Sequence, residues 1–131
     1  MVVPLDGSSL ADTVLPLAGA LAPALDLRPQ IISVIEPSAT TGETDMPPES
    51  SMVRSAAVSL EKETGSPVDY EVLHGDRPAH SIVEWSADAA MIAMSTHGRT
   101  GLARLVAGSV AMEVIHRAPC PVLVHRPSHF S

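Results

Sequence analysis

The chain has 131 residues, of which 45% are hydrophobic and 18% are charged, and its formal net charge is −7. This composition excludes a disordered or collagen-like chain and suits one domain with its own core. The negative charge repels a nucleic-acid backbone, and a single Phe, Trp and Tyr leave little surface for stacking bases. One cysteine excludes an internal disulfide, and we find neither a membrane-spanning apolar run nor a secretory signal.

The first third of the chain predicts two strands with a helix between them. Residues 1–5 and 30–35 are short apolar runs, the second typical of a strand that is covered on both faces. Residues 10–25 place apolar side chains at helical spacing, with Ser8 or Ser9 as the expected N-cap. The prolines of this helix are expected to kink it or end it early; they are Pro16 and Pro23.

The remaining sequence continues the alternation. Residues 36–50 are rich in Pro, Thr, Ser and acids, which predicts an exposed, mobile loop. The elements expected after it are a helix at 51–64, a strand at 68–73, a helix at 78–87, a strand at 89–94, a helix at 108–117 and a strand at 121–125. Gly65 and Pro78 are the expected end and beginning of the flanking helices.

Helical spacing also predicts which side chains point inward. In the helix at 51–64 these are Met52, Val53, Ala56, Ala57 and Leu60. The helix at 78–87 places Ile82 and Trp85 on one side, and the helix at 108–117 is expected to point Val110, Val114 and Ile115 inward.

Strands that alternate with helices predict an α/β fold, with a parallel sheet and helices on both of its faces. We find no internal repeat, so we expect one domain over residues 1–126, followed by a polar tail at 127–131. Ligands of such sheets bind beyond the carboxyl ends of the strands, where the strand order reverses. Topology therefore predicts that Asp6, after the first strand, and residues 95–98, after the fourth, meet at one crevice.

The stretch from Met94 to Ser109 (MSTHGRTGLARLVAGS) is the main functional candidate. Glycines let backbone N–H groups approach a ligand closely, and the helix after Gly108 offers unpaired N–H donors at its positive end. Together these features are typical of a phosphate site. The alternative is that the glycines only make turns.

Several candidate residues have two interpretations. Asp6 is either a ligand-binding acid or a turn and capping residue. His97 has no paired acid and no second ligand at metal spacing, which favours a loop or phosphate-facing role over a base or metal ligand. Ser109 without an evident base favours a helix cap and phosphate contact over a nucleophile. Cys120, between two prolines, is expected to be a buried structural thiol.

The familiar nucleotide fingerprints are absent. The chain has no Gly-x4-Gly-Lys-Ser/Thr and no Gly-x-Gly-x-x-Gly after its first strand, which excludes an ordinary P-loop NTPase and disfavours a dinucleotide oxidoreductase. No lysine or evident base is placed for phosphoryl transfer. We therefore expect no catalytic residues and no metal ligands.

Three segments resemble the universal stress protein family. They are VPLDGS (3–8), GDRPAHSI (75–82) and STHGRTGLARLVAGSVAMEVIHRAPCPVLV (95–124), so the resemblance covers nearly the whole chain. The family pattern is Gly-x2-Gly-x9-Gly-Ser/Thr. This chain supplies Gly98, nine residues and Gly108-Ser109, but has Ser95 where the pattern begins with glycine.

The resemblance implies a three-layer α/β/α domain of the adenine nucleotide alpha hydrolase-like class, with five parallel strands in the order 3-2-1-4-5. It also implies an ATP site. In that site Asp6 would accept a hydrogen bond from the nucleoside, beside Pro4 and Leu5, and the backbone of Val34 would contact adenine. The positions implied along the ribose and phosphates are Met94, Ser95, His97, Gly98, Arg99, Gly108, Ser109 and Val110.

What the resemblance implies about function is an ATP-binding regulatory protein of the stress response, in the cytoplasm, with Mg²⁺ accompanying the triphosphate. It further implies a homodimer that pairs through the last strand at 121–125. Two alternatives remain open. One is an interaction protein of the same fold that binds no nucleotide, with Ser95 marking the loss of the site. The other is a slow ATPase in which His97 or Asp6 positions water.

Overall fold

The computed structural model describes residues 1–6, 12–35, 48–96 and 109–126, with the backbone alone for residues 48–50. Within these ranges the elements are, in order, β1 (Val2–Pro4), α2 (Val14–Ala24), β2 (Gln30–Ile35), α3 (Pro48–Thr64), β3 (Asp69–His74), α4 (Pro78–Trp85), β4 (Ile92–Ser95), α5 (Ser109–Arg117) and β5 (Val122–His125). Every expected strand and helix that falls in the described ranges is present.

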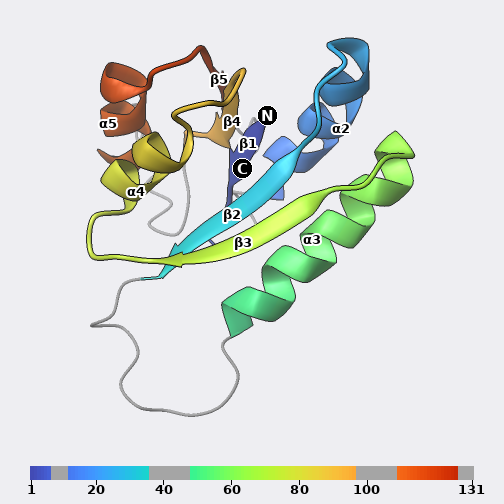
Figure 1. Cartoon of the computed structure of the whole chain (residues 1–131), viewed down its shortest axis with the longest axis horizontal. Helices are drawn as coiled ribbons and strands as arrows, with labels where there is room; N and C mark the ends of the chain where they lie inside the picture. The colour runs from blue at the N-terminus through green and yellow to red at the C-terminus, as the bar shows by residue number, and fades with distance from the viewer. Residues whose placement is uncertain (7–11, 36–47, 97–108, 127–131) are drawn as a thin grey trace.

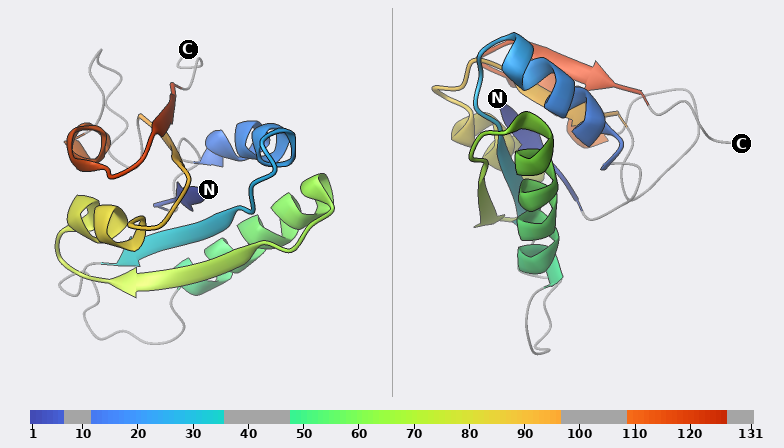
Figure 2. Two further views of the ribbon diagram at one scale, coloured as in Figure 1. Left: turned by 45° about the horizontal axis from the view of Figure 1, so that its top comes forward. Right: turned by 90° about the vertical axis from the view of Figure 1, so that its right-hand side faces the viewer.

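The five strands form one parallel sheet in the order β3-β2-β1-β4-β5, as the family resemblance implied. Figure 1 shows α2 and α3 on one face of this sheet and α4 and α5 on the other, and the left-hand view of Figure 2 shows the same two helix pairs on opposite sides. The predicted three-layer α/β/α architecture is therefore confirmed.

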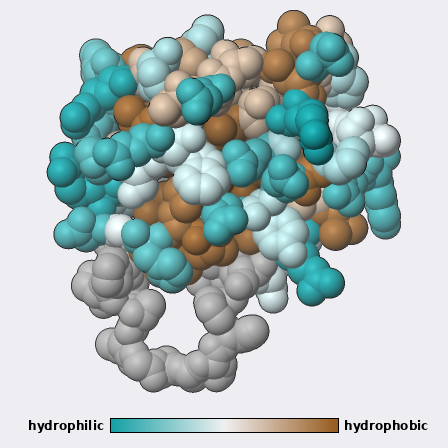
Figure 3. All heavy atoms as spheres, in the orientation of Figure 1, coloured by the Kyte–Doolittle hydropathy of each residue, from teal (hydrophilic) through white to brown (hydrophobic). Residues whose placement is uncertain are grey.

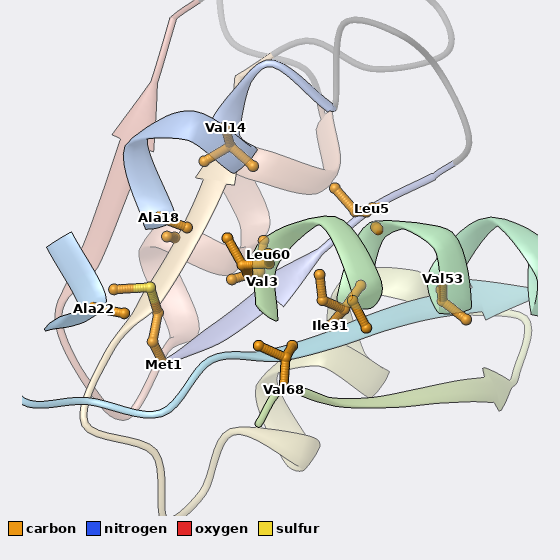
Figure 4. Close-up of a cluster of buried hydrophobic side chains, with 13 residues drawn as sticks. Met1, Val3, Leu5, Val14, Ala18, Ala22, Ile31, Val53, Leu60 and Val68 are labelled. Atoms are coloured by element: carbon orange, nitrogen blue, oxygen red, sulfur yellow. The ribbon is translucent and has the colours of Figure 1, made fainter. Parts of the chain in front are cut away.

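Each face of the sheet has its own hydrophobic cluster. The cluster under α2 and α3 contains Val3, Val14, Ile31 and Leu60, which Figure 4 shows converging from β1, β2 and the two helices. The cluster under α4 and α5 contains Ile32 and Val114 among others. Neighbouring residues of β2 thus enter opposite clusters, because side chains alternate along a strand. This explains why residues 30–35 read as a continuous apolar run.

The helix α3 begins at Pro48, inside the segment that was expected to be loop up to residue 50. Proline suits the first turn of a helix because its missing N–H has no intrahelical partner there. The remainder of that expected loop, residues 36–47, lies outside the described residues. The inward face of α3 is confirmed, since Val53, Ala56, Ala57 and Leu60 are buried and Met52 packs against them.

The prolines of α2 lie near its two ends. Pro16 occupies the first turn, where no intrahelical bond is lost, and Pro23 lies in the last turn, one residue before the helix ends. Gly19 faces α3, and a Cβ there would meet the Glu63 carboxylate and the Leu60 side chain. The missing side chain therefore lets α2 and α3 approach closely. The predicted N-cap positions, Ser8 and Ser9, lie outside the described residues.

Two of the three side chains that were expected to point inward from α5 do not. In α5, Val110 and Ile115 are exposed, and the buried residues are Ala111 and Val114. The small Ala111 brings the helix against the sheet, and this rotates its larger neighbours outward. In α4, Ile82 is buried, whereas Trp85 is 39% exposed and its Nε1 donates to Gln30 Oε1 at 2.9 Å. The indole N–H needs a polar partner, which favours the rim over the core.

Candidate functional site

The predicted crevice follows from the strand order. β1 occupies the middle of the sheet, with β2 and β3 on one side and β4 and β5 on the other. The chain therefore leaves β1 for β2 in one direction and later returns to β4 on its other side. The reversal lies between β1 and β4, where sheets of this class bind ligands beyond the carboxyl ends.

Pro4 limits the pairing of these two strands. The Val2 N–H donates to Met91 O at 2.9 Å, so the even-numbered residues of β1 face β4. Pro4 is the next residue with that orientation, but it has no N–H to donate. The register between β1 and β4 accordingly stops at Val2–Ile92. A proline in a central strand is unusual, and here it removes one donor from the ladder toward the carboxyl ends of β1 and β4. We call this break in the register the gap between β1 and β4.

Asp6 follows β1 at this gap. Leu5 before it is 3% exposed and donates its N–H to Ile32 O of β2 at 2.8 Å, which fixes the backbone. Asp6 itself is half-buried. Val34 on β2 lies two residues beyond Ile32, the register partner of Pro4, so it reaches the same edge of the sheet as Asp6. The structure thus brings Pro4, Leu5, Asp6 and Val34 to one edge.

Met94 and Ser95 end β4 on the other side of the gap. Both are buried, and their register partners on β5 are Val124 and His125. The backbone of Ser95 is not in the left-handed region, since Asp26 is the only non-glycine residue with positive φ in the described part of the chain. Ser95 is therefore a strand residue, and its Cβ causes no backbone strain. The strain that would follow from a glycine-requiring conformation is absent.

Ser109 and Val110 are the first two residues of α5, and both are exposed. The first four N–H groups of a helix have no intrahelical partner, so this turn can offer donors to an anion. Four further predicted positions lie outside the described residues, namely His97, Gly98, Arg99 and Gly108.

One residue at this edge was missed by the sequence analysis. Asp12 precedes α2, and its Oδ1 atom is buried with no hydrogen-bond partner. Burial raises the pKa of the Asp12 carboxyl, and the negative charge of Asp6 raises it further. Asp12 therefore lies within electrostatic range of Asp6. No local pattern signals this burial, because an acid near the start of a helix is usually a solvated residue.

Within the described ranges, no group of three or more His, Cys, Asp or Glu side chains could hold a metal ion. Burial raises the pKa of the half-buried Cys120 thiol, with an opposing effect from the charged α-amino group, so thiolate is disfavoured there. Among the described helices, none is both long enough and apolar enough to span a membrane.

A hollow of about 300 Å³ lies at the opposite, amino end of the sheet. Its lining includes Arg28, Gln30, Asp69, Trp85 and Asp88, and no predicted site residue is among them. This hollow is therefore separate from the candidate site at the carboxyl edge.

The model of the universal stress protein family matches residues 1–126. A universal stress protein of Methanocaldococcus jannaschii is 34% identical over 139 aligned residues, which cover 95% of this chain and 79% of the relative. A universal stress protein of Mycobacterium tuberculosis is 45% identical over 53 residues, which cover 40% of this chain and only 18% of the relative's length.

Solved structures of the same class carry ligands. A universal stress protein from Archaeoglobus fulgidus in complex with dAMP is 25% identical, with a TM-score of 0.74 and 94% of each chain covered. Another universal stress protein, in complex with cAMP, is 23% identical, with a TM-score of 0.75 and with 97% of this chain and 95% of that chain covered. The second likeness shows the fold alone.

Proposed function

The chain belongs to the universal stress protein family, and from that membership we propose that it is a regulatory protein of the stress response that binds ATP at the carboxyl edge of its sheet. The observation that carries this proposal is the gap between β1 and β4, which has Asp6 on one side and Ser95 on the other. The relatives in complex with dAMP and cAMP support an adenine nucleotide as the ligand.

We assign the nucleoside end of the ligand to β1 and β2. Asp6 accepts a hydrogen bond from the nucleoside, with Pro4 and Leu5 beside it, and the backbone of Val34 contacts adenine. A half-buried acid suits this role because part of its hydration is already replaced by protein. The site thus distinguishes adenine through the backbone and the nucleoside through one carboxylate.

The phosphate end of the ligand falls to β4 and α5. Met94 and Ser95 lie along the ribose and α-phosphate, and the first turn of α5 holds the phosphates through the N–H groups of Ser109 and Val110 and the Ser109 hydroxyl. The proposed phosphate contacts outside the described residues are His97, Gly98, Arg99 and Gly108. Because the chain carries a net charge of −7, these local donors must outweigh a repulsive field. Mg²⁺ accompanies ATP as the counterion of the triphosphate.

We further propose that the protein acts in the cytoplasm as a homodimer paired through residues 121–125. β5 is an edge strand of the sheet, and all four of its residues are half-buried. An apolar edge strand is a template for pairing with another chain, and a second copy satisfies its free backbone groups.

A nucleotide-free interaction protein of the same fold is the second candidate, and Ser95 in place of the family glycine is the observation that favours it. The strand conformation of Ser95 removes backbone strain as a reason for losing the ligand, so we expect ATP to bind with reduced rather than abolished affinity. A slow ATPase is the third candidate, and it requires phosphate release that depends on Asp6 or His97.

The test is direct measurement of nucleotide binding. Protein purified without added nucleotide is denatured, the released small molecules are analysed by mass spectrometry, and ATP is then titrated by calorimetry. We expect released adenine nucleotide or measurable ATP binding, with stabilisation of about 2.7 kcal/mol at an ATP concentration one hundred times the Kd. Asp6→Ala and Gly108→Val should each weaken binding at least tenfold.

Asp88→Ala is the matched control, since Asp88 is an exposed acid at the amino end of the sheet. It should leave ATP affinity unchanged. A protein that carries no nucleotide and gives neither heat nor a thermal shift with ATP would overturn the proposal in favour of the interaction protein.

A further inference from the structure

The environment of Asp12 is unfavourable for a residue with a purely structural role. Its Oδ1 atom is buried without a hydrogen-bond partner. A buried acceptor without a partner destabilises the folded protein, and a second acid nearby adds repulsion. A polar residue that only started the helix would face solvent or cap the backbone instead. The presence of an acid at position 12 therefore needs another explanation.

Chain neighbours of Asp6 and of Asp12 belong to one hydrophobic cluster. Leu5, one residue before Asp6, and Val14, two residues after Asp12, are both buried in the cluster under α2 and α3, as Figure 4 shows. The two carboxyls consequently project from anchored backbones, and the charge of Asp6 acts on Asp12.

The other elements packed against α2 bring few charges to this point. α2 itself has no titratable side chain, and β4 has none either. Of the charged residues described on α3, Glu63 faces Gly19 in the middle of α2; the others on that helix are Arg54, Glu61 and Lys62. Beyond β4, His125 and Arg126 lie at the carboxyl end of β5. Among the described residues, the charge that acts on Asp12 is that of Asp6.

We propose that Asp12 is a positioning residue that takes up a proton as the pH falls, removes a negative charge that acts on Asp6, and so strengthens nucleotide binding. This inference rests on the proposed nucleotide site. With Asp12 ionised, two carboxylates repel each other and the phosphates of an approaching nucleotide. With Asp12 protonated from solvent, Asp6 remains as the single acceptor for the nucleoside.

Stability of the free protein tests the proton without any nucleotide. The pKa of Asp12 is raised in the folded state above its ordinary value of 3.8, so folding prefers the protonated form. The contribution of Asp12 to stability is therefore fully present below pH 3.8, and it is lost as the pH rises through the folded-state pKa of this carboxyl. Asp12→Asn, which is neutral at every pH, should raise the Tm of the free protein at neutral pH by about 3 °C. The difference from wild type should shrink as the pH falls toward 4.

Nucleotide affinity tests whether removing the charge of Asp12 strengthens binding. MgATP is titrated into wild type and Asp12→Asn between about pH 4.5 and pH 7.5, and the ratio of the two Kd values is taken at each pH so that the ionisation of ATP itself cancels. We expect Asp12→Asn to bind about fivefold more tightly at pH 7.5 and the ratio to approach one in acid. Asp88→Asn, an exposed acid at the far end of the sheet, should follow wild type throughout.

The two measurements separate the possible failures. A wild-type protein that binds no nucleotide at any pH overturns the proposed function and the effect on affinity, while the stability profile still decides whether Asp12 holds a proton. A Kd ratio that does not change with pH overturns the inference alone. A lower Tm for Asp12→Asn at neutral pH also overturns it, because it would make Asp12 a stabilising structural residue. If Asp12→Asn does not fold, carboxyl NMR titration of Asp12 in wild type and Asp6→Asn decides, and an unchanged midpoint contradicts the coupling.

Discussion

Asp26 and Gly65 follow the first two described helices, and both adopt a left-handed backbone, with φ of 59° and 72°. After α2, the Leu27 N–H donates to Ala22 O and the Asp26 N–H to Pro23 O, which is the bonding pattern of a Schellman motif. Glycine is the usual residue at this position because a Cβ is strained there. Asp26 therefore holds a position suited to glycine, whereas Gly65 was predicted from the sequence and is confirmed.

The first prediction concerns substitutions at these two left-handed positions. Asp26→Gly should stabilise the protein by about 1 kcal/mol, because it removes the left-handed strain and an acid from the negative end of α2. Gly65→Ala should destabilise it by a similar amount. A Cβ at Gly65 meets nothing within 4 Å, so the backbone is the only source of the cost. Thermal unfolding should show shifts of about 3–5 °C in opposite directions; a neutral Gly65→Ala would contradict the explanation.

Among individual site residues, some could be predicted from the sequence and one could not. Asp6 and Ser95 were identified because they follow apolar runs, and the structure brings their strand ends to the same edge of the sheet. Asp12 was missed because its burial depends on how α2 packs against β1. No local pattern distinguishes a buried acid at a helix start from a solvated one.

At the scale of elements, β5 offers an asymmetric edge. The Ile92 N–H donates to Pro121 O and the Thr96 N–H to His125 O, so alternate residues of the strand face β4. Leu123 shares that orientation, whereas the backbone groups of Val122 and Val124 point away from β4. The backbone groups of Val122 and Val124 are therefore available to a partner strand.

The second prediction uses this asymmetry. Val124→Pro removes an outward N–H and should convert the proposed dimer to monomer, with most of the stability retained because edge strands tolerate proline on the free side. Leu123→Pro is the matched variant that breaks pairing with β4, and it should cost about 3 kcal/mol. Light scattering after size exclusion measures the mass. A Val124→Pro protein that is still dimeric would place the interface elsewhere.

The helices show why element bounds were predicted better than their orientation. The end of α3 and the beginning of α4 follow from glycine and proline signals that act within a few residues. Which side of α5 faces the sheet depends on the space that the sheet and α4 leave. The sequence favoured the large Val110 and Ile115, and the structure buries the small Ala111 instead.

At the scale of the molecule, one sheet separates two hydrophobic clusters. Ile31 and Ile32 are adjacent on β2 and fully buried, one in each cluster. Because both clusters depend on the same strands, loss of either should unfold the other. Figure 3 shows hydrophobic and hydrophilic side chains interspersed on the face it displays, and the exposed large side chains include Leu25 and Val58.

The third prediction tests that cooperativity. Ile31→Val and Ile32→Val should each lower the free energy of unfolding by about 1 kcal/mol and move a single transition by about 3–5 °C. Val58→Ala, at a side chain that is 46% exposed, should change stability by less than about 0.5 kcal/mol. Calorimetry that resolved two transitions, with each variant affecting only one, would contradict a shared core.

The sequence by itself determined the elements, their alternation, the parallel sheet and the edge at which a ligand is expected. These follow from periodicity and from proline and glycine, which act over a few residues and therefore leave a local record. Strand order came from the family resemblance, since no local pattern specifies which strands become neighbours.

Only the tertiary structure decided three features that bear on the stretch from Met94 to Ser109 and its partners. Pro4 removes a donor from the ladder between β1 and β4, Ser95 has a strand backbone, and one carboxyl oxygen of the half-buried Asp12 lies buried within the field of Asp6. Each depends on contacts between segments far apart in the chain. The burial and electrostatic field that give these residues their chemistry exist only after the sheet and its helices have packed.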